Sequence, residues 1–207
     1  MSDGSAQQEI VMEPGKQEEE RPPGFFARIL AWIAHGGGGV AVREETLVVE
    51  NDFILRVLPH RGRWCLLDRV VITPQKVVGF LTIRPEVCEG HAIGDDAVLP
   101  GVLLAEMANQ LLGVWYATQH LELIGAGKVL FARDGSYKAS GFIRPGELVR
   151  IEVDYGNLSG IMKTTRRGTI MKLEGKDFLV KVGEELRGSV PLVELMGVES
   201  PKTTSPT

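Results

Sequence analysis

Hydrophobic and polar positions divide the chain into a polar beginning, a patterned middle and a polar end. Residues 1–23 are rich in Gln, Glu, Pro and Gly, and such a segment buries too little apolar surface to offset the entropy lost on ordering. From residue 46 to residue 197, apolar side chains recur with the periods of strands and helices. We therefore predict one folded domain at 46–197, an N-terminal region at 1–45 that begins as a disordered tail, and a disordered C-terminal tail at 198–207.

A short apolar segment stands inside the N-terminal region. Phe25, Phe26, Ile29 and Leu30 follow one another at helical spacing, and four glycines at 36–39 come soon after. This pattern predicts an amphipathic helix over about 24–35 and a flexible glycine joint. Docking on the core or on a partner subunit is the favoured role. Membrane-surface contact is the less favoured alternative, because the segment carries only one base before the glycines.

The patterned middle predicts an α+β domain. A short helix should end at Pro59, and two β-branched runs around Pro74-Gln75 should form a hairpin. The apolar run at 101–121 predicts one long helix. Four further strands are expected at 128–138, 147–155, 163–174 and 177–186, with turns at 144–146 and 174–176. One long helix and about six antiparallel strands favour a sheet that covers the helix.

Composition narrows the partners and the compartment. A net charge of -4 gives the chain no overall attraction for a polyanion. The two cysteines stand in apolar strand-like segments, which fits a reducing, cytoplasmic environment, and no run approaches the ~20 apolar residues of a membrane span. No metal-ligand cluster, phosphate-binding loop or nucleic-acid motif is present. We expect no cofactor, no nucleic-acid partner and no membrane contact.

Glu106 is the only carboxylate of the long predicted helix. It shares a stripe with Asn109, Gln110, Gly113 and Ala117, and this stripe could be a narrow solvated face. A solvated face normally carries several charges, whereas this one offers amides and small residues beside a single acid. We therefore favour a functional acid that faces a cleft.

His91 lies in a loop that leads to the start of the same helix. Pro100 suits a first helical turn, and Gly101 lets a ligand approach the backbone. Free N–H groups and the positive dipole end there could hold a thioester oxygen as it gains negative charge. A histidine by itself is more often a loop or capping residue. Together with Pro100 and Gly101, however, His91 and Glu106 predict a pocket with a base, an oxyanion site and an acid.

Three segments together resemble a known family. LPHRGRWCLLDRV at 58–70, GHAIGDDAVLPGVLLAEMANQ at 90–110 and FARDGSYKASGFIRPGELVRIEV at 131–153 are similar to segments of β-hydroxyacyl-acyl-carrier-protein dehydratases, in the family's order. The resemblance covers about 52–186. It implies the hot-dog fold, a long central helix wrapped by an antiparallel sheet, in a dimer or a trimer of dimers.

The resemblance also implies site roles. The family's catalytic histidine and glutamate match His91 and Glu106, and they come from different subunits. Pro100 and Gly101 match the Pro-Gly whose glycine N–H polarises the thioester carbonyl, and Gln110 matches the motif glutamine. The implied reaction is the reversible dehydration of β-hydroxyacyl-acyl carrier protein to the trans-2-enoyl product in fatty-acid synthesis.

The sequence departs from the family pattern beside the histidine. Ala92-Ile93 replaces Phe-Pro, and the interval from His91 to Glu106 is one residue longer, so the loop at 92–98 is expected to bulge. Three alternatives stay open: an acyl thioesterase, an enoyl-CoA hydratase, and a non-catalytic acyl-binding subunit on the same fold.

Two further groups of polar residues support weaker predictions. The basic residues Lys128, Arg133, Lys138, Arg144 and Arg150 predict a docking surface for acidic acyl carrier protein, with a solvated strand face as the equal alternative. His60, Arg61 and Asp68 are interpreted as structural, in a turn and a strand whose polar groups pair with each other.

Overall fold

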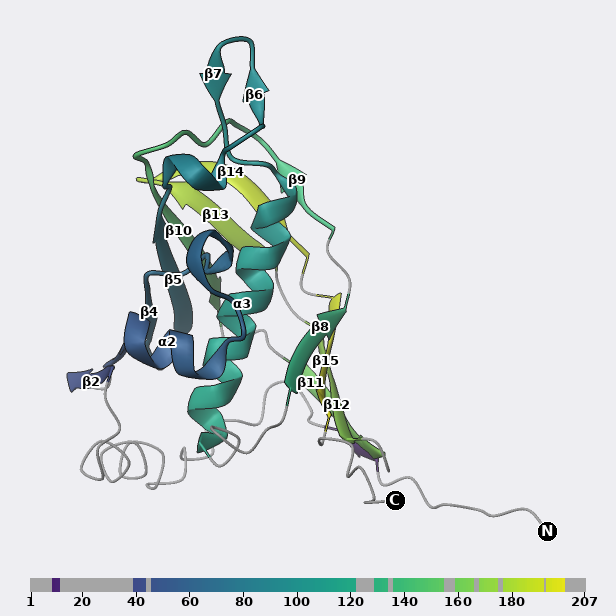
Figure 1. Ribbon diagram of the computed structural model, residues 1–207. Coiled ribbons are helices and arrows are strands. Elements are labelled where there is room, and N and C mark those ends of the chain that lie inside the picture. Colours follow the sequence, from purple (N-terminus) through teal and green to yellow (C-terminus); the bar gives the residue numbers. More distant parts are fainter. Residues whose placement is uncertain are drawn as a thin grey trace, which may run out of the picture.

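The computed structural model describes residues 9–11, 39–43, 46–121, 129–133, 136–154, 159–165, 168–174, 177–191 and 193–199. An eight-stranded antiparallel sheet with the order β2-β3-β4-β5-β10-β13-β14-β9 forms the main layer. Its strands are β2 (Val40–Arg43), β3 (Thr46–Glu50), β4 (Arg69–Ile72), β5 (Lys76–Thr82), β9 (Lys138–Ala139), β10 (Leu148–Asp154), β13 (Phe178–Val182) and β14 (Glu185–Val190). A five-stranded sheet stands apart from it, with the order β1-β11-β12-β15-β8 (Figure 1).

The long helix α3 (Val102–Gln119) packs along the eight-stranded sheet, and the short helix α2 (Asn51–Val57) lies beside it (Figure 1). Twelve of the 18 residues of α3 are buried, so the helix is wrapped as its apolar circumference predicts. Gly79 of β5 permits this close approach, because a Cβ there would lie 2.7 Å from Leu67 Cδ2 and 3.1 Å from Leu111 Cδ1. The core is the apolar layer between sheet and helices.

Several predicted elements are confirmed. The short helix ends at Val57, two residues before Pro59, and β4 pairs with β5 as the predicted antiparallel hairpin. The turn at 144–146 is present, with a positive φ of 87° at Gly146. The two cysteines are free and buried, as their apolar segments predicted. The turn expected at 174–176 falls mostly outside the described residues.

Three predicted single strands are wrong, because each is divided. The run at 128–138 becomes β8 (Val129–Arg133) in one sheet and β9 in the other. The run at 163–174 belongs to β11 (Ser159–Thr165) and β12 (Gly168–Glu174), which pair with each other. The run at 177–186 turns back between β13 and β14, where Gly183 adopts a positive φ of 58°. Each run holds a single glycine, and an isolated glycine inside a strand pattern is as typical of a bulge as of a turn, so the pattern did not reveal the divisions.

The ends of the domain also differ from the expected boundaries. β2 joins the sheet before residue 46, and β15 (Val193–Glu199) extends past residue 197. β1 (Glu9–Val11) pairs with β11 inside the segment expected to be a disordered tail. The predicted helix at 24–35 and most of the glycine joint lie outside the described residues. Among the helices that are described, none is long and apolar enough to cross a membrane.

Candidate active site

His91 stands at the base of a small hairpin that leads to α3. Strands β6 (Ala92–Ile93) and β7 (Asp96–Ala97) pair across a turn in which Gly94 has a φ of 61°, and the hairpin projects from one end of the molecule (Figure 1). Val98 N–H donates to the His91 carbonyl at 3.1 Å, which closes the base of the hairpin. The bulge expected in this loop therefore takes the form of a regular turn, which leaves the histidine close to the helix.

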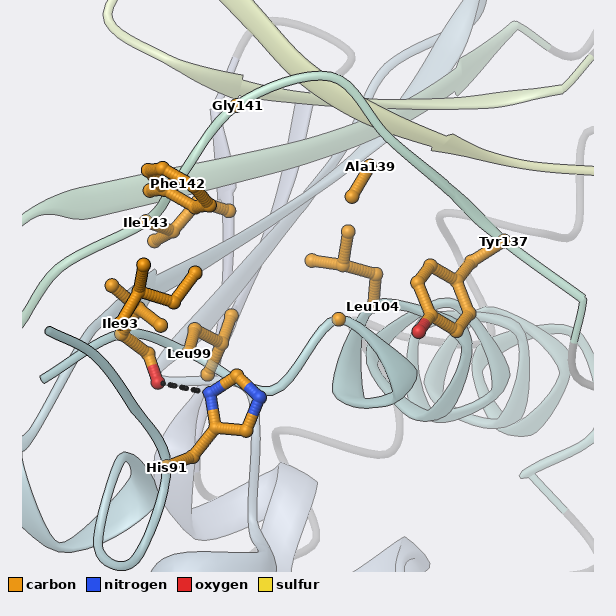
Figure 2. Close-up of a pocket in the computed structure, with 11 residues that line it drawn as sticks. His91, Ile93, Leu99, Leu104, Tyr137, Ala139, Gly141, Phe142 and Ile143 are labelled. Carbon is orange, nitrogen blue, oxygen red and sulfur yellow. Dashed lines mark hydrogen bonds between the residues drawn. The ribbon is translucent and has the colours of Figure 1, made fainter.

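A backbone hydrogen bond fixes the tautomer of His91. Its Nδ1 lies 3.0 Å from the carbonyl oxygen of Val98, and a carbonyl oxygen can only accept (Figure 2). Nδ1 must therefore carry a hydrogen. In the neutral imidazole, Nε2 is then unprotonated and free to act as a base.

The start of α3 lies beside this histidine. Leu103 N–H donates to Pro100 O and Leu104 N–H donates to Gly101 O, while the N–H groups of Gly101 and Val102 form no hydrogen bond with the described residues. These free donors lie at the positive end of the helix dipole. A Cβ on Gly101 would lie 2.5 Å from Tyr137 Cε2, so this position accepts the tyrosine ring only because it is glycine.

A cavity joins these parts. It is lined by His91 and Gly101 and by apolar or aromatic side chains that include Leu104, Tyr137 and Phe142 (Figure 2). Tyr137 and Phe142 are 40% and 49% exposed, so the mouth of the cavity is apolar and open. The arrangement offers a base, two backbone donors and an apolar wall.

Glu106 does not line this cavity in the same chain. Leu104 points into the cavity, and a residue two positions further along a helix points about 200° away. Glu106 faces the loop that follows α2, and its side chain is 35% exposed. The structure therefore brings His91 to Gly101 and Pro100, and leaves Glu106 on another side of the helix.

Glu106 contacts one side chain from the loop that follows α2 and one from the next turn of α3. Gln110 Nε2 donates to Glu106 Oε1 at 2.9 Å, and His60 Nε2 lies 3.1 Å from the same oxygen. Gln110 is only 1% exposed, and it also binds the loop backbone, accepting from Leu66 N–H and donating to Trp64 O, both at 2.8 Å. The glutamine thus attaches the loop to α3 and positions the carboxylate.

These contacts test two interpretations of the sequence. The solvated-stripe alternative is wrong for Gln110, Gly113 and Ala117, all of which are buried. Asp68 has structural contacts, but with other partners than predicted, because it accepts from Thr82 N–H and pairs with Arg84 rather than with His60 or Arg61. For His60 a purely local pairing is wrong, because its side chain contacts the candidate acid 46 residues away. In the sequence, only the position of His60 within the motif at 58–70 pointed to a role near the site.

The predicted docking residues do not form one described cluster. Lys138 is exposed in β9, and Arg144 lies 3.4 Å from Asp96 of the hairpin, so both flank the segment that lines the cavity. Arg150 instead pairs with Glu152 on β10 and with Glu184 in the turn between β13 and β14. Lys128 and the side chain of Arg133 lie outside the described residues. Among the residues that are described, no cluster of His, Cys, Asp and Glu could hold a metal ion.

Comparison with known proteins identifies the class. Residues 58–178, more than half of the chain, match the FabA-like domain family, and this chain belongs to that family. The matched region contains the loop that follows α2, the hairpin, α3 and four of the eight strands of the main sheet. The fold is the α+β hot-dog fold, so both the predicted fold and the predicted family are confirmed.

Individual relatives extend this finding. The chain is 32% identical over 131 residues to the 3-hydroxyacyl-acyl-carrier-protein dehydratase FabZ of Rhizorhabdus wittichii, a match that covers 61% of this chain and 77% of the relative. It is 28% identical over 155 residues to FabZ of Caldanaerobacter subterraneus, covering 73% of this chain and 100% of the relative. Among solved structures, the dehydratase heterocomplex ApeI:P from Xenorhabdus doucetiae matches with a TM-score of 0.46 and 17% identity, over 73% of this chain and 92% of that one.

Proposed function

We propose that this protein catalyses the reversible dehydration of β-hydroxyacyl thioesters on acyl carrier protein to trans-2-enoyl thioesters, in fatty-acid synthesis. The observation that carries the proposal is the tautomer of His91, whose Nδ1–H is held by Val98 O beside the free donors of the α3 N-terminus. Membership of the FabA-like family and the dehydratase names of the relatives support the choice of reaction.

The chemistry follows from the geometry. The Gly101 N–H would hold the thioester oxygen, which makes the C2–H acidic. His91 Nε2 would take the C2 proton, and the electron pair of that bond would form the C2=C3 double bond. The C3–O bond would break as Glu106 gives its proton to the departing hydroxyl, so that water leaves. Exchange of one proton with solvent returns both side chains to their starting states.

The acid of each site would come from a second copy of this chain. Within one chain, His91 lines the cavity and Glu106 faces another side of α3. Exposed apolar side chains at the cavity mouth, Ile93, Tyr137 and Phe142, offer a surface for that partner or for the acyl chain. A homodimer, or a trimer of such dimers, would place the two catalytic residues together.

Lys138 and Arg144 are the described candidates for steering the acidic carrier, and Arg133 and Lys128 would extend that surface. The double change Lys138→Glu and Arg144→Glu should lower kcat/KM for the carrier-bound substrate at least 10-fold more than for the CoA-bound substrate, with a gap that narrows at high salt. Arg56→Glu, on the exposed face of α2, is the matched control. Equal losses on both substrates would remove the docking role.

One assay tests the reaction itself. The protein is incubated with β-hydroxybutyryl and crotonyl thioesters on carrier protein and on CoA, while enoyl absorbance and free thiol are followed. We expect interconversion of the two substrates without release of thiol. Release of thiol without interconversion would identify a thioesterase, and neither change would identify a non-catalytic acyl-binding protein.

A further inference from the structure

The loop after α2 presents His60 to Glu106 in a fixed position. Arg61 holds this loop from one side, donating to Leu58 O at 2.6 Å and to His60 O at 2.7 Å. Gln110 holds it from the other side through the backbone of Trp64 and Leu66. An imidazole placed between two such attachments has little freedom to move away from the carboxylate.

The two oxygens of Glu106 have different surroundings. Oε1 accepts a hydrogen bond from Gln110 Nε2 at 2.9 Å and lies 3.1 Å from His60 Nε2. Oε2 receives no hydrogen bond from any residue that the structure describes. In a protonated carboxyl, the oxygen that accepts two N–H donors is the carbonyl-like oxygen, and the proton then belongs on the other oxygen.

The buried nitrogen of His60 indicates its tautomer. Nδ1 is buried and has no hydrogen-bond partner among the described residues. A buried N–H without an acceptor is costlier than a buried lone pair on a neutral nitrogen, above all when the ring is charged. The hydrogen of the neutral ring therefore belongs on Nε2, which donates it to Glu106 Oε1.

We propose that His60 is a positioning residue that donates its Nε2–H to Glu106 Oε1 and so places the transferable proton on Oε2. The role in turnover rests on the proposed dehydration, whereas the hydrogen bond and the tautomer do not. When Oε2 gives its proton to the leaving hydroxyl, the same two donors would stabilise the carboxylate that forms. A permanent ion pair between imidazolium and carboxylate is the competing arrangement, and it would leave Glu106 with no proton to give.

Two substitutions separate donation from mere space filling. His60→Gln keeps an N–H donor near the place of Nε2, and His60→Leu keeps similar volume without a donor. We expect His60→Leu to lower kcat about 10-fold or more while KM changes less than 2-fold, and His60→Gln to recover most of that loss. His120→Leu, at the far end of α3, is the control and should retain the wild-type kcat. Equal losses in kcat for the Leu and Gln variants would overturn the positioning role, provided that both melt cooperatively near the wild-type temperature.

A spectroscopic measurement tests the tautomer without turnover. In protein labelled with ¹⁵N-histidine, the His60 ring at neutral pH should show one protonated nitrogen, Nε2, and one unprotonated nitrogen, Nδ1, with assignment by loss of the signals in His60→Gln. Two protonated nitrogens would identify the ion pair and overturn the inference. If the wild type proves inactive in dehydration, the proposed function fails, and the ring signals still decide whether His60 donates as a neutral side chain.

Discussion

Two partly buried carboxylates, Glu106 on the helix side and Glu152 on the outer face of the sheet, have opposite kinds of partner. Glu152 alternates with the core residues Ile151 and Val153 along β10, so its side chain leaves the core. Two cations reach it, Lys181 and Arg150. Glu106 instead meets an amide and an imidazole on one oxygen.

The difference lies in the charge of the groups that contact each carboxylate. Burial works to raise the pKa of Glu152, but the hydrogen bond and charge of Lys181, with the charges of Arg150 and Lys76, outweigh burial and leave the pKa lowered. That side chain stays ionised at neutral pH. Around Glu106 no described lysine or arginine forms an ion pair, and its partners are the amide of Gln110 and the imidazole of His60. The partners, rather than the burial, distinguish the two carboxylates.

The largest expected effect is on turnover. Glu106→Gln keeps size and much of the hydrogen bonding but cannot deliver a proton, so kcat for dehydration should fall about 100-fold or more. Glu152→Gln is the matched control and should change kcat less than 2-fold. Initial rates of enoyl formation measure both. A nearly silent Glu106→Gln would remove the carboxylate from the reaction.

Subunit mixing sharpens the same prediction. His91→Ala should be about as damaging as Glu106→Gln, and the double variant little worse than either, because both groups serve one sequence of proton transfers. Mixed dimers of the two single variants contain one intact cross-subunit site and should regain part of the activity. Absence of recovery after demonstrated subunit exchange would exclude a site shared between subunits.

The next effect is on stability, on the helix side. Gln110→Leu would leave the backbone groups of Leu66 and Trp64 without their buried partner, and should lower the free energy of unfolding by about 2–3 kcal/mol. Gln119→Leu is the control, because that amide makes one long contact of 3.4 Å to a neighbouring hydroxyl at the helix end. Denaturant unfolding of both variants provides the comparison. Equal small losses would show that Gln110 does not attach the loop to α3.

A smaller effect, and a pH dependence, is expected on the outer face. Glu152→Gln should lower the free energy of unfolding by about 1–2 kcal/mol at pH 7, because the Lys181 ammonium loses its charged partner. The folded pKa of Glu152 is lowered, so its stabilisation is fully present above the unfolded pKa and is lost as pH falls through the folded pKa. The difference between variant and wild type should therefore shrink below about pH 4. A difference that is constant from pH 7 to pH 3 would contradict the ionised state.

The smallest effect concerns the hairpin beside His91. Gly94→Ala places a side chain at a positive φ of 61° and should cost about 1 kcal/mol. No atom lies within 4 Å of the added Cβ, so the strain stays local and kcat should change less than 2-fold. Thermal melting and initial rates test this together. A large loss of rate with little loss of stability would show that the hairpin tip, rather than its base, sets the position of His91.

Much of the candidate site could be read from local sequence. His91, Pro100 and Gly101 are close along the chain, so a loop that leads to a helix start brings them together without help from distant residues. The same locality explains why the hairpin at Pro74-Gln75 was found. Where an isolated glycine makes the turn, as Gly183 does between β13 and β14, the local pattern did not distinguish a bulge from a reversal and predicted one strand instead of two.

The sequence by itself determined the buried long helix, the single acid on it and the histidine before its first turn, because the spacing of apolar residues and the chemistry of Pro-Gly are local properties. Only the tertiary structure decided what surrounds that acid. His60 and Gln110 meet at Glu106 because the loop after α2 folds back onto α3, and contacts across 46 residues depend on how the helices and the sheet pack rather than on any periodicity in the chain. The tertiary structure likewise placed His91 and Glu106 on different sides of α3, since that relation depends on where the hairpin docks.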